Sequence, residues 1–193
     1  MVITKTDFRE LEDKYGGFAS WAIWDLSDPT NSEIIRNNIE SLNPSVVMVG
    51  LNISAPLQHP WSNFRIGRND RKLIHAFNEG RFRGAYMTDL FKGEIEVNSA
   101  NIQKRIRNGE LDILRHTRDF VTEMNDIGAD QGSLFILFGG LVAELFKKYL
   151  AGHYPYFVAC QHYAVYGSKE TWASETLERL TKYDESRSQH EPR

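Results

Sequence analysis

The sequence has a single cysteine and no long hydrophobic run. Because Cys160 has no second cysteine with which to pair, the 193-residue chain forms no internal disulfide, and we expect it to reside in a reducing compartment. Residues 1–10 lack the apolar segment of a secretion signal, and no run approaches the length of a membrane-spanning helix. We therefore expect a cytoplasmic protein with no membrane partner.

The motifs of several large enzyme classes are also absent. The sequence contains neither G-x-x-x-x-G-K-[ST] nor G-x-G-x-x-G, the two glycine-rich phosphate-binding patterns. It has no G-x-S-x-G, the turn that carries the nucleophile of many hydrolases. Its six histidines and one cysteine show no metal-ligand spacing, so we expect no metal and no cofactor. Cys160 ends a predicted strand, which indicates a buried thiol rather than a nucleophile.

Length and composition favour one domain. A chain of 193 residues with 41% hydrophobic content can bury one sizeable core but not two comfortable ones. We expect a single domain over residues 1–183, followed by a polar, disordered tail over residues 184–193. The composition does not indicate an oligomeric state.

Positive charge is concentrated in two stretches of a chain whose net charge is −3. Residues 61–83 carry a net charge of +4, and residues 101–118 carry +3. Such stretches can bind a phosphate backbone without making the whole protein basic, and Arg65, Arg68 and Arg71 are the candidate phosphate-binding residues. The alternative is that both stretches are ordinary solvated surfaces.

Hydrophobic periodicity predicts an α/β fold. Short apolar runs alternate with amphipathic segments, which favours a central, mostly parallel four-stranded sheet with helices on both faces, a three-layer α/β/α arrangement. The predicted strands cover residues 45–54, 84–91, 133–138 and 156–160. The predicted helices cover residues 6–15, 30–42, 70–80, 112–127, 141–150 and 168–183, whereas residues 98–108 look irregular.

Each predicted strand is followed by, or ends in, polar residues or a glycine turn. These ends carry Asn52, the pair Thr88-Asp89, the turn Gly139-Gly140, and His162. Because ligands of parallel sheets bind beyond the carboxyl ends of the strands, Asn52 and His162 are candidate site residues, and Gly50 would let the backbone approach a ligand closely. The alternatives are that Asn52 caps its own backbone and that His162 is a structural histidine.

Two further residues have both a functional and a structural interpretation. Phe64 lies in a loop among basic residues, where an exposed ring could stack on a base, although the same ring could anchor the loop in the core. Asp89 follows a buried run, where a carboxylate is costly unless it is paired or solvated. It could contact the edge of a ligand or cap the next turn.

Four segments, in order, resemble motifs of the uracil-DNA glycosylase superfamily. Gly50-Leu51-Asn52 resembles its first motif, in the Gly-x-Asn form of some branches. The run from Ala85 to Lys92 is similar to its second strand, and the run from Phe135 to Ala143 to its third strand and following helix. Gln161-His162 falls where the family has a His-Pro-Ser motif. The similarity spans about residues 44–183.

The resemblance implies a DNA glycosylase that flips a base into a pocket and cleaves its N-glycosidic bond with water. It implies that Asn52 orients the water and that His162 stabilises the departing base, so these two are the expected catalytic residues. Gly50, Leu51, Phe64 and Asp89 would bind the base. The partner would be DNA or another ligand that contains a nucleobase, and no iron–sulfur cluster is expected, because the cysteines for one are missing.

Asp89 is the informative departure from the family pattern. Members that bind uracil have Asn at this position, and an amide can both donate and accept hydrogen bonds, whereas an ionised carboxylate only accepts. A base edge rich in donors, or a protonated Asp89, would be compatible with this residue. The sequence also leaves two other functions open. One is a catalytically inactive domain of the same fold that binds nucleic acid, a nucleotide or a protein, and the other is an enzyme acting on free nucleosides or another small polar ligand.

Overall fold

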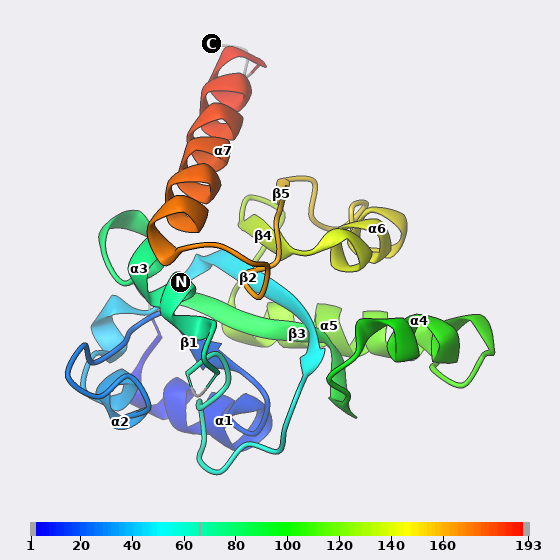
Figure 1. Cartoon of the computed structure of the whole chain (residues 1–193). Coiled ribbons are helices and arrows are strands. Elements are labelled where there is room, and N and C mark those ends of the chain that lie inside the picture. Colours follow the sequence, from blue (N-terminus) through cyan, green and yellow to red (C-terminus); the bar gives the residue numbers. More distant parts are fainter. Residues whose placement is uncertain (1–2, 66, 191–193) are drawn as a thin grey trace.

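The computed structural model describes residues 3–65 and 67–190 and contains a five-stranded sheet with the strand order β1-β3-β2-β4-β5 (Figure 1). β3, β2, β4 and β5 run parallel to one another, and β1 pairs antiparallel with β3 at the edge. The strands are β1 Ser20–Trp21, β2 Asn43–Ile53, β3 Ala85–Ile95, β4 Leu134–Phe138 and β5 Phe157–Cys160.

Helices connect the parallel strands. The described residues form the seven α-helices α1 Lys5–Tyr15, α2 Glu33–Arg36, α3 Asp70–Phe77, α4 Ser99–Arg107, α5 Ile113–Ile127, α6 Gly140–Tyr149 and α7 Lys169–His190. Two short 3-10 helices cover Ile39–Ser41 and Gly80–Phe82. Within the described ranges, no helix is both long and apolar enough to cross a bilayer.

Hydrophobic side chains of the central strand point alternately to two clusters, as the period of a strand requires. Val47 and Val49 of β2 belong to one cluster, which also contains side chains of α1, α5 and α6. Val46 and Met48 belong to the other, which contains side chains of α3 and α7. Helices α3 and α7 lie side by side (Figure 1). Burying both faces of β2 explains its almost uninterrupted apolar sequence.

The predicted α/β class with a mostly parallel sheet is confirmed, but the predicted number of four strands is wrong. The additional strand, Ser20–Trp21, has only two residues, and its residues pair with Met87 and Tyr86. A strand of two residues is too short to show an alternating pattern, so periodicity cannot identify it.

Two helical predictions also need correction. Most of the stretch over residues 98–108 forms α4 Ser99–Arg107, because the Asn98 side chain accepts the N–H of Ala100 and Ile102 is buried. The predicted helix over residues 30–42 is reduced to α2 and a 3-10 turn. The Thr30 hydroxyl donates to Asp28 rather than capping a helix.

The end of the chain differs from the expected disordered tail. α7 continues past residue 183 to His190, while residues 191–193 lie outside the described residues. The Arg81 guanidinium forms an ion pair with the Asp184 carboxylate, which links the distal half of α7 to the loop after α3. A polar composition did not prevent helix formation here because the segment extends a helix that is already anchored by packing.

Arg65 is part of the core rather than a phosphate-binding residue. Its side chain is 3% exposed, and its guanidinium donates to the main-chain oxygens of Trp21, Ile23 and Trp61 and to the Ser20 hydroxyl. The prediction that Arg65 binds phosphate is therefore wrong, because its donors are consumed inside the fold. Burial lowers the pKa of Arg65 to about 10, so the group stays charged at neutral pH.

We expect Arg65→Met to lower the free energy of unfolding by about 3 kcal/mol or more. The substitution keeps an unbranched side chain but removes the charge-assisted hydrogen bonds to the main-chain oxygens of Trp21, Ile23 and Trp61, each worth about 1.5–3 kcal/mol. Among the described residues, no other donor then remains for the Ile23 oxygen, whereas the Trp21 and Trp61 oxygens keep the Ile23 N–H and the Ser20 hydroxyl. Urea denaturation followed by circular dichroism measures the change. Arg71→Met, at an exposed position of α3, should change stability by less than about 0.5 kcal/mol. Equal effects of the two substitutions would contradict the structural role of Arg65.

Candidate functional site

A cavity of about 580 Å³ lies at the carboxyl-terminal side of the parallel strands. β2, β3 and the segments after β4 and β5 all contribute to its wall, as does the loop over residues 54–69. The sheet therefore brings together side chains that are far apart in the sequence. The cavity is lined by seven of the predicted site residues, namely Gly50, Leu51, Asn52, Phe64, Arg68, Asp89 and His162.

Gly50 and Asp89 face each other directly across the β2–β3 pairing. A Cβ atom at position 50 would lie 2.2 Å from Asp89 Oδ1 and 3.4 Å from a ring carbon of Phe64. The Asp89 carboxylate thus occupies the space that any larger residue at position 50 would need. Glycine is required here for close packing rather than for an unusual backbone angle.

Asp89 is held in a fixed orientation by Asn63. The Asn63 Nδ2 group donates to Asp89 Oδ2 at 2.8 Å and also to the main-chain oxygen of Phe18. The orientation of this amide is set because Asn63 Oδ1 accepts the main-chain N–H of Phe64. Asp89 is 4% exposed, and burial raises its pKa to about 6, opposed by the hydrogen bond from Asn63 and by the charge of Lys92.

A buried polar cluster lies behind Asp89. The Lys92 Nζ atom donates to the main-chain oxygen of Asp89 and lies 2.6 Å from Glu123 Oε2. Glu123 is fully buried on α5, and its Oε1 accepts from the hydroxyls of Tyr86 and Thr88. Because each charge has an oppositely charged or hydrogen-bonding partner, this cluster anchors the end of β3 from the side opposite the cavity.

Asn52 has a structural role and one free acceptor. Its Nδ2 group donates to the main-chain oxygens of Ile53, Glu94 and Glu96 at 2.8, 3.3 and 2.7 Å, which joins the end of β2 to the end of β3. No described residue donates a hydrogen bond to Asn52 Oδ1. The amide nitrogen is therefore committed to the backbone, while the half-buried amide still offers an acceptor oxygen at the cavity wall.

His162 presents a hydrogen-bond donor. Its Nδ1 atom accepts the main-chain N–H of Ala164 at 3.0 Å, so in the neutral ring the proton lies on Nε2. Burial lowers the pKa of His162, which keeps the ring neutral at pH 7. The imidazole stacks on the Tyr163 ring, with centroids 4.4 Å apart. Gly139, whose φ of 103° favours glycine, forms the turn after β4 beside the imidazole.

Aromatic rings form one part of the wall. Phe64 is 4% exposed and lies edge to face with Tyr163, with ring centroids 6.3 Å apart, and Tyr163 in turn contacts Phe138. Phe64 has φ of 59°, a left-handed conformation that costs about 1 kcal/mol or more for a residue with a side chain. Its ring anchors the loop in the core and borders the cavity, so the ring is buried rather than exposed as the stacking interpretation assumed.

Asp70 is a candidate site residue that the sequence does not reveal. The sequence indicates only the start of a helix at this position, yet Asp70 lines the cavity and is 7% exposed. Its Oδ2 accepts the main-chain N–H of Gly67 at 2.8 Å, and burial raises its pKa to about 6. The charge of Asp70 also raises the pKa values of Asp89 and Tyr163, which places these three groups near one another. A polar residue at a helix start gives no signal of such burial.

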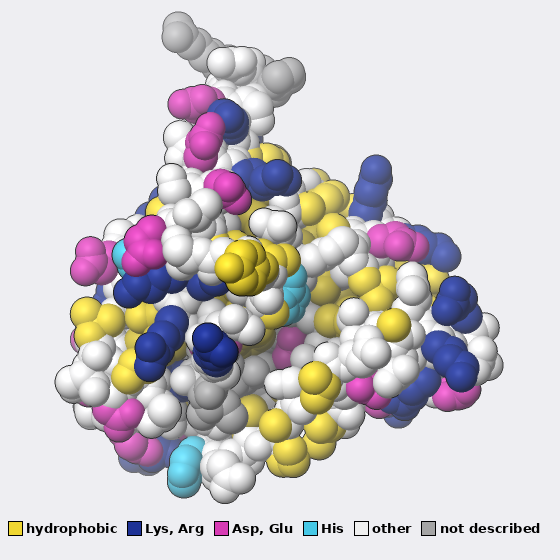
Figure 2. Space-filling model, in the orientation of Figure 1, with side chains coloured by type: hydrophobic (Ala, Val, Ile, Leu, Met, Phe, Trp, Pro, Cys, Tyr) yellow, Lys and Arg dark blue, Asp and Glu magenta, His cyan; other side chains and the backbone are white. Residues whose placement is uncertain are grey.

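Basic side chains of the first positive stretch are only partly at the cavity. Arg68 lines the cavity and is exposed, whereas Arg71 is exposed on α3 and does not line it. Figure 2 shows Lys and Arg side chains on both sides of the hydrophobic centre of this face. Of the three arginines predicted to bind phosphate, Arg68 is the one at the cavity wall.

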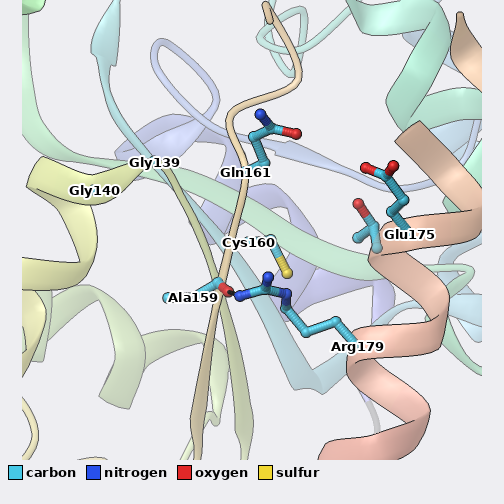
Figure 3. A pocket seen from close by; sticks show the side chains of 8 residues that line it. Gly139, Gly140, Ala159, Cys160, Gln161, Glu175 and Arg179 are labelled. Atoms are coloured by element: carbon cyan, nitrogen blue, oxygen red, sulfur yellow. Dashed lines mark hydrogen bonds between the residues drawn. The ribbon is translucent and has the colours of Figure 1, made fainter. Parts of the chain in front are cut away.

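A second cavity, of about 420 Å³, lies between β5 and α7 (Figure 3). Arg179 reaches across it and donates to the main-chain oxygen of Ala159, with Glu175 one turn away on α7. Cys160 also lines it, and burial raises the pKa of this thiol to about 11, so the expected buried thiol is observed. Among the described residues that line this cavity, none was predicted to be a site residue from the sequence.

We expect Gly50→Ala to destabilise the protein by about 1–3 kcal/mol, because the new methyl group collides with Asp89 Oδ1. In an Asp89→Ala background the same substitution should cost much less, since the colliding oxygen is gone. Chemical denaturation of the four proteins measures this coupling. Gly17→Ala is the control, since nothing lies within 4 Å of a Cβ at position 17. Equal costs in both backgrounds would contradict the proposed contact.

Asp70 should make stability depend on pH in a defined window. Its folded pKa of about 6 lies above the ordinary value of 3.8, so between about pH 4 and pH 6 the folded state binds more protons than the unfolded state. The free energy of unfolding therefore falls as pH rises through this window, by about 1.4 kcal/mol for each pKa unit.

Asp70→Asn removes this titration, so its stability relative to the wild type should increase from pH 4 to pH 6 and stay constant above. Denaturation at a series of pH values tests the prediction. Asp119→Asn, on the exposed side of α5, controls for the loss of one negative charge. A stability difference between Asp70→Asn and wild type that is independent of pH would show that Asp70 titrates normally.

We compared the chain with known protein families, curated proteins and solved structures. No family model, curated protein or solved structure matches this chain.

Proposed function

We propose that the 580 Å³ cavity binds a nucleobase and that the protein hydrolyses the N-glycosidic bond of the bound nucleotide. The observation that carries the proposal is the convergence of Asn52, Asp70, Asp89 and His162 on one cavity beside aromatic rings. The volume lies within the roughly 300–1,000 Å³ typical of small-molecule sites. The ordered resemblance of four sequence segments to the uracil-DNA glycosylase superfamily supports the same reaction.

Recognition of the base uses apolar surface and a few directed polar groups. Phe64 and Tyr163 supply aromatic surface against which a flat heterocycle packs. His162 contributes a donor and Asp89 an acceptor, so the polar edge of the base is contacted from two walls. Arg68, at the exposed part of the cavity, is placed to contact a phosphate of the same nucleic acid chain, which makes DNA the proposed partner.

Hydrolysis needs a polarised water and a stabilised leaving group. In the proposed reaction, water attacks C1′ of the sugar while the bond from C1′ to the base nitrogen breaks, and the bonding electrons move onto the base. Asn52 Oδ1 accepts a hydrogen bond from the water, and the Asp70 carboxylate takes its proton. The Nε2–H of His162 donates to the base carbonyl, where negative charge develops.

His162→Gln should lower the rate of base release by about 100-fold or more, the usual effect of removing one donor to a developing oxyanion. The assay uses single-stranded and duplex oligonucleotides containing cytosine, uracil, hypoxanthine or a mismatch, and detects abasic sites by alkaline cleavage. His153→Gln, at an exposed position, is the matched control and should retain full activity. Because Asp70 must be ionised, activity should rise with pH through about 6.

Release of no base from any substrate would contradict the proposal of hydrolysis. Equal loss of activity in His162→Gln and His153→Gln would contradict the assigned role of His162. Asn52→Ala should also reduce activity, but it removes three contacts to the backbone, so its folding must be checked by circular dichroism.

Binding of a nucleobase without cleavage is the second candidate function. The observation in its favour is that the Asn52 amide nitrogen is fully used in joining β2 to β3, which is a structural role. Under this alternative, the wild-type protein binds oligonucleotides with an affinity that falls steeply with salt, and no abasic sites form.

A further inference from the structure

We infer that the cavity selects a base carrying both an amino group and a ring carbonyl, the pattern of cytosine and guanine, over a base with two carbonyls such as uracil. This inference rests on the proposed function, since it takes the ligand to be a nucleobase. It follows from which atoms of His162 and Asp89 remain free to contact a ligand.

His162 can only donate to the ligand. Its Nδ1 atom is occupied by the main-chain N–H of Ala164, so the free ring atom of the neutral imidazole is Nε2, which carries the proton. The stacking on Tyr163 and the hydrogen bond from the Ala164 N–H hold the ring in this orientation. A carbonyl oxygen of the base is the complementary group for this wall.

Asp89 can only accept while it is ionised. One carboxylate oxygen, Oδ2, is occupied by Asn63, whose own amide cannot rotate, because Phe64 donates to its oxygen and Phe18 accepts from its nitrogen. The other oxygen, Oδ1, lies over Gly50, in the space left by the missing side chain, and no described residue donates to it. An amino group of the base is the complementary partner for this oxygen.

The two walls together distinguish bases that differ by one substituent. Cytosine and guanine each carry one carbonyl oxygen and one amino group, so they can satisfy His162 Nε2–H and Asp89 Oδ1 together. Uracil would place a second carbonyl oxygen against the Asp89 carboxylate, where two acceptors repel and neither is satisfied. Sites that hydrogen-bond a specific group discriminate strongly against ligands that leave a buried polar atom unpaired.

The experiment compares short fluorescent single-stranded oligonucleotides that differ only at one base, cytosine or uracil, with guanine and xanthine as a second pair. Fluorescence polarisation measures binding of the wild-type protein at pH 8, where Asp89 is ionised. We expect the base with the amino group to bind about ten- to a hundredfold more tightly in at least one pair. The pair that shows the preference identifies whether the ligand is a pyrimidine or a purine.

Asp89→Asn provides the decisive variant. An amide at this position keeps an acceptor for Asn63 and presents an N–H group to the cavity, so the preference should reverse in favour of the dicarbonyl base. Asp119→Asn makes the same chemical change on the exposed side of α5 and should leave the preference unchanged. Thermal denaturation of Asp89→Asn verifies that the variant is folded.

Protonation of the Asp89 carboxylate should change the base preference in the same direction as Asp89→Asn. As pH falls through about 6, Asp89 gains a proton and becomes a donor, so the preference for the amino base should weaken. Asp70, Glu123 and Lys92 are the charged groups that influence this titration, and all three are unchanged in Asp89→Asn. Because Asp70 also has a pKa of about 6 and is present in both proteins, the preference should depend on pH less in Asp89→Asn than in the wild type.

The failure of this inference is distinguishable from the failure of the proposed hydrolysis, because the experiment measures binding. Equal affinity for both members of each pair, tighter binding of uracil and xanthine by the wild type, or no effect of Asp89→Asn would overturn the inference even if bases are released. A preference that reverses in Asp89→Asn would support it even if no abasic site forms. No measurable binding of any oligonucleotide would overturn it together with the assignment of a nucleobase.

Discussion

The Asp89 carboxylate lies in the space that a side chain at position 50 would occupy, and the candidate site depends on this contact. Parallel pairing of β2 with β3 places Gly50 opposite Asp89, and the absence of a Cβ lets the carboxylate lean across the gap. The loop residue Asn63 then closes over Asp89 with a hydrogen bond, which positions the adjacent Phe64 at the cavity wall. The contact between Gly50 and Asp89 thereby fixes the position of the loop residues Asn63 and Phe64 as well as the spacing of the two strands.

Burial of charge around this contact is costly, and the fold offsets the cost through specific partners. Asp89 has Asn63, Glu123 has Lys92 and two hydroxyls, and Arg65 has main-chain oxygens of two neighbouring segments. Asp70 has one main-chain donor and a raised pKa, so it is the least compensated carboxylate at the cavity. Buried groups with raised pKa values that share a cavity are typical of functional sites, which is why Asp70 and Asp89 are central to the proposed chemistry.

The sequence predicted the parts of the molecule that periodicity and strand ends reveal. The long apolar run of β2 and the alternation with amphipathic helices identified the α/β sheet, and parallel strand ends placed Asn52, Asp89 and His162 in one region. The roles of Arg65 and Asp70 could not be predicted, because both depend on the path of an irregular loop with left-handed residues at Trp61 and Phe64. Charge pattern alone cannot distinguish an arginine that binds the backbone of its own fold from one that binds a phosphate.

The proposed function depends on binding of a nucleobase in the cavity beside Gly50. The most direct test is a residue-resolved amide NMR spectrum of the wild-type protein recorded during titration with cytidine. We expect progressive chemical-shift changes concentrated at Gly50, Leu51, Asn63 and Ala164, which line the cavity. Shift changes confined to the second cavity around Arg179, or no shift changes at saturating cytidine, would contradict it.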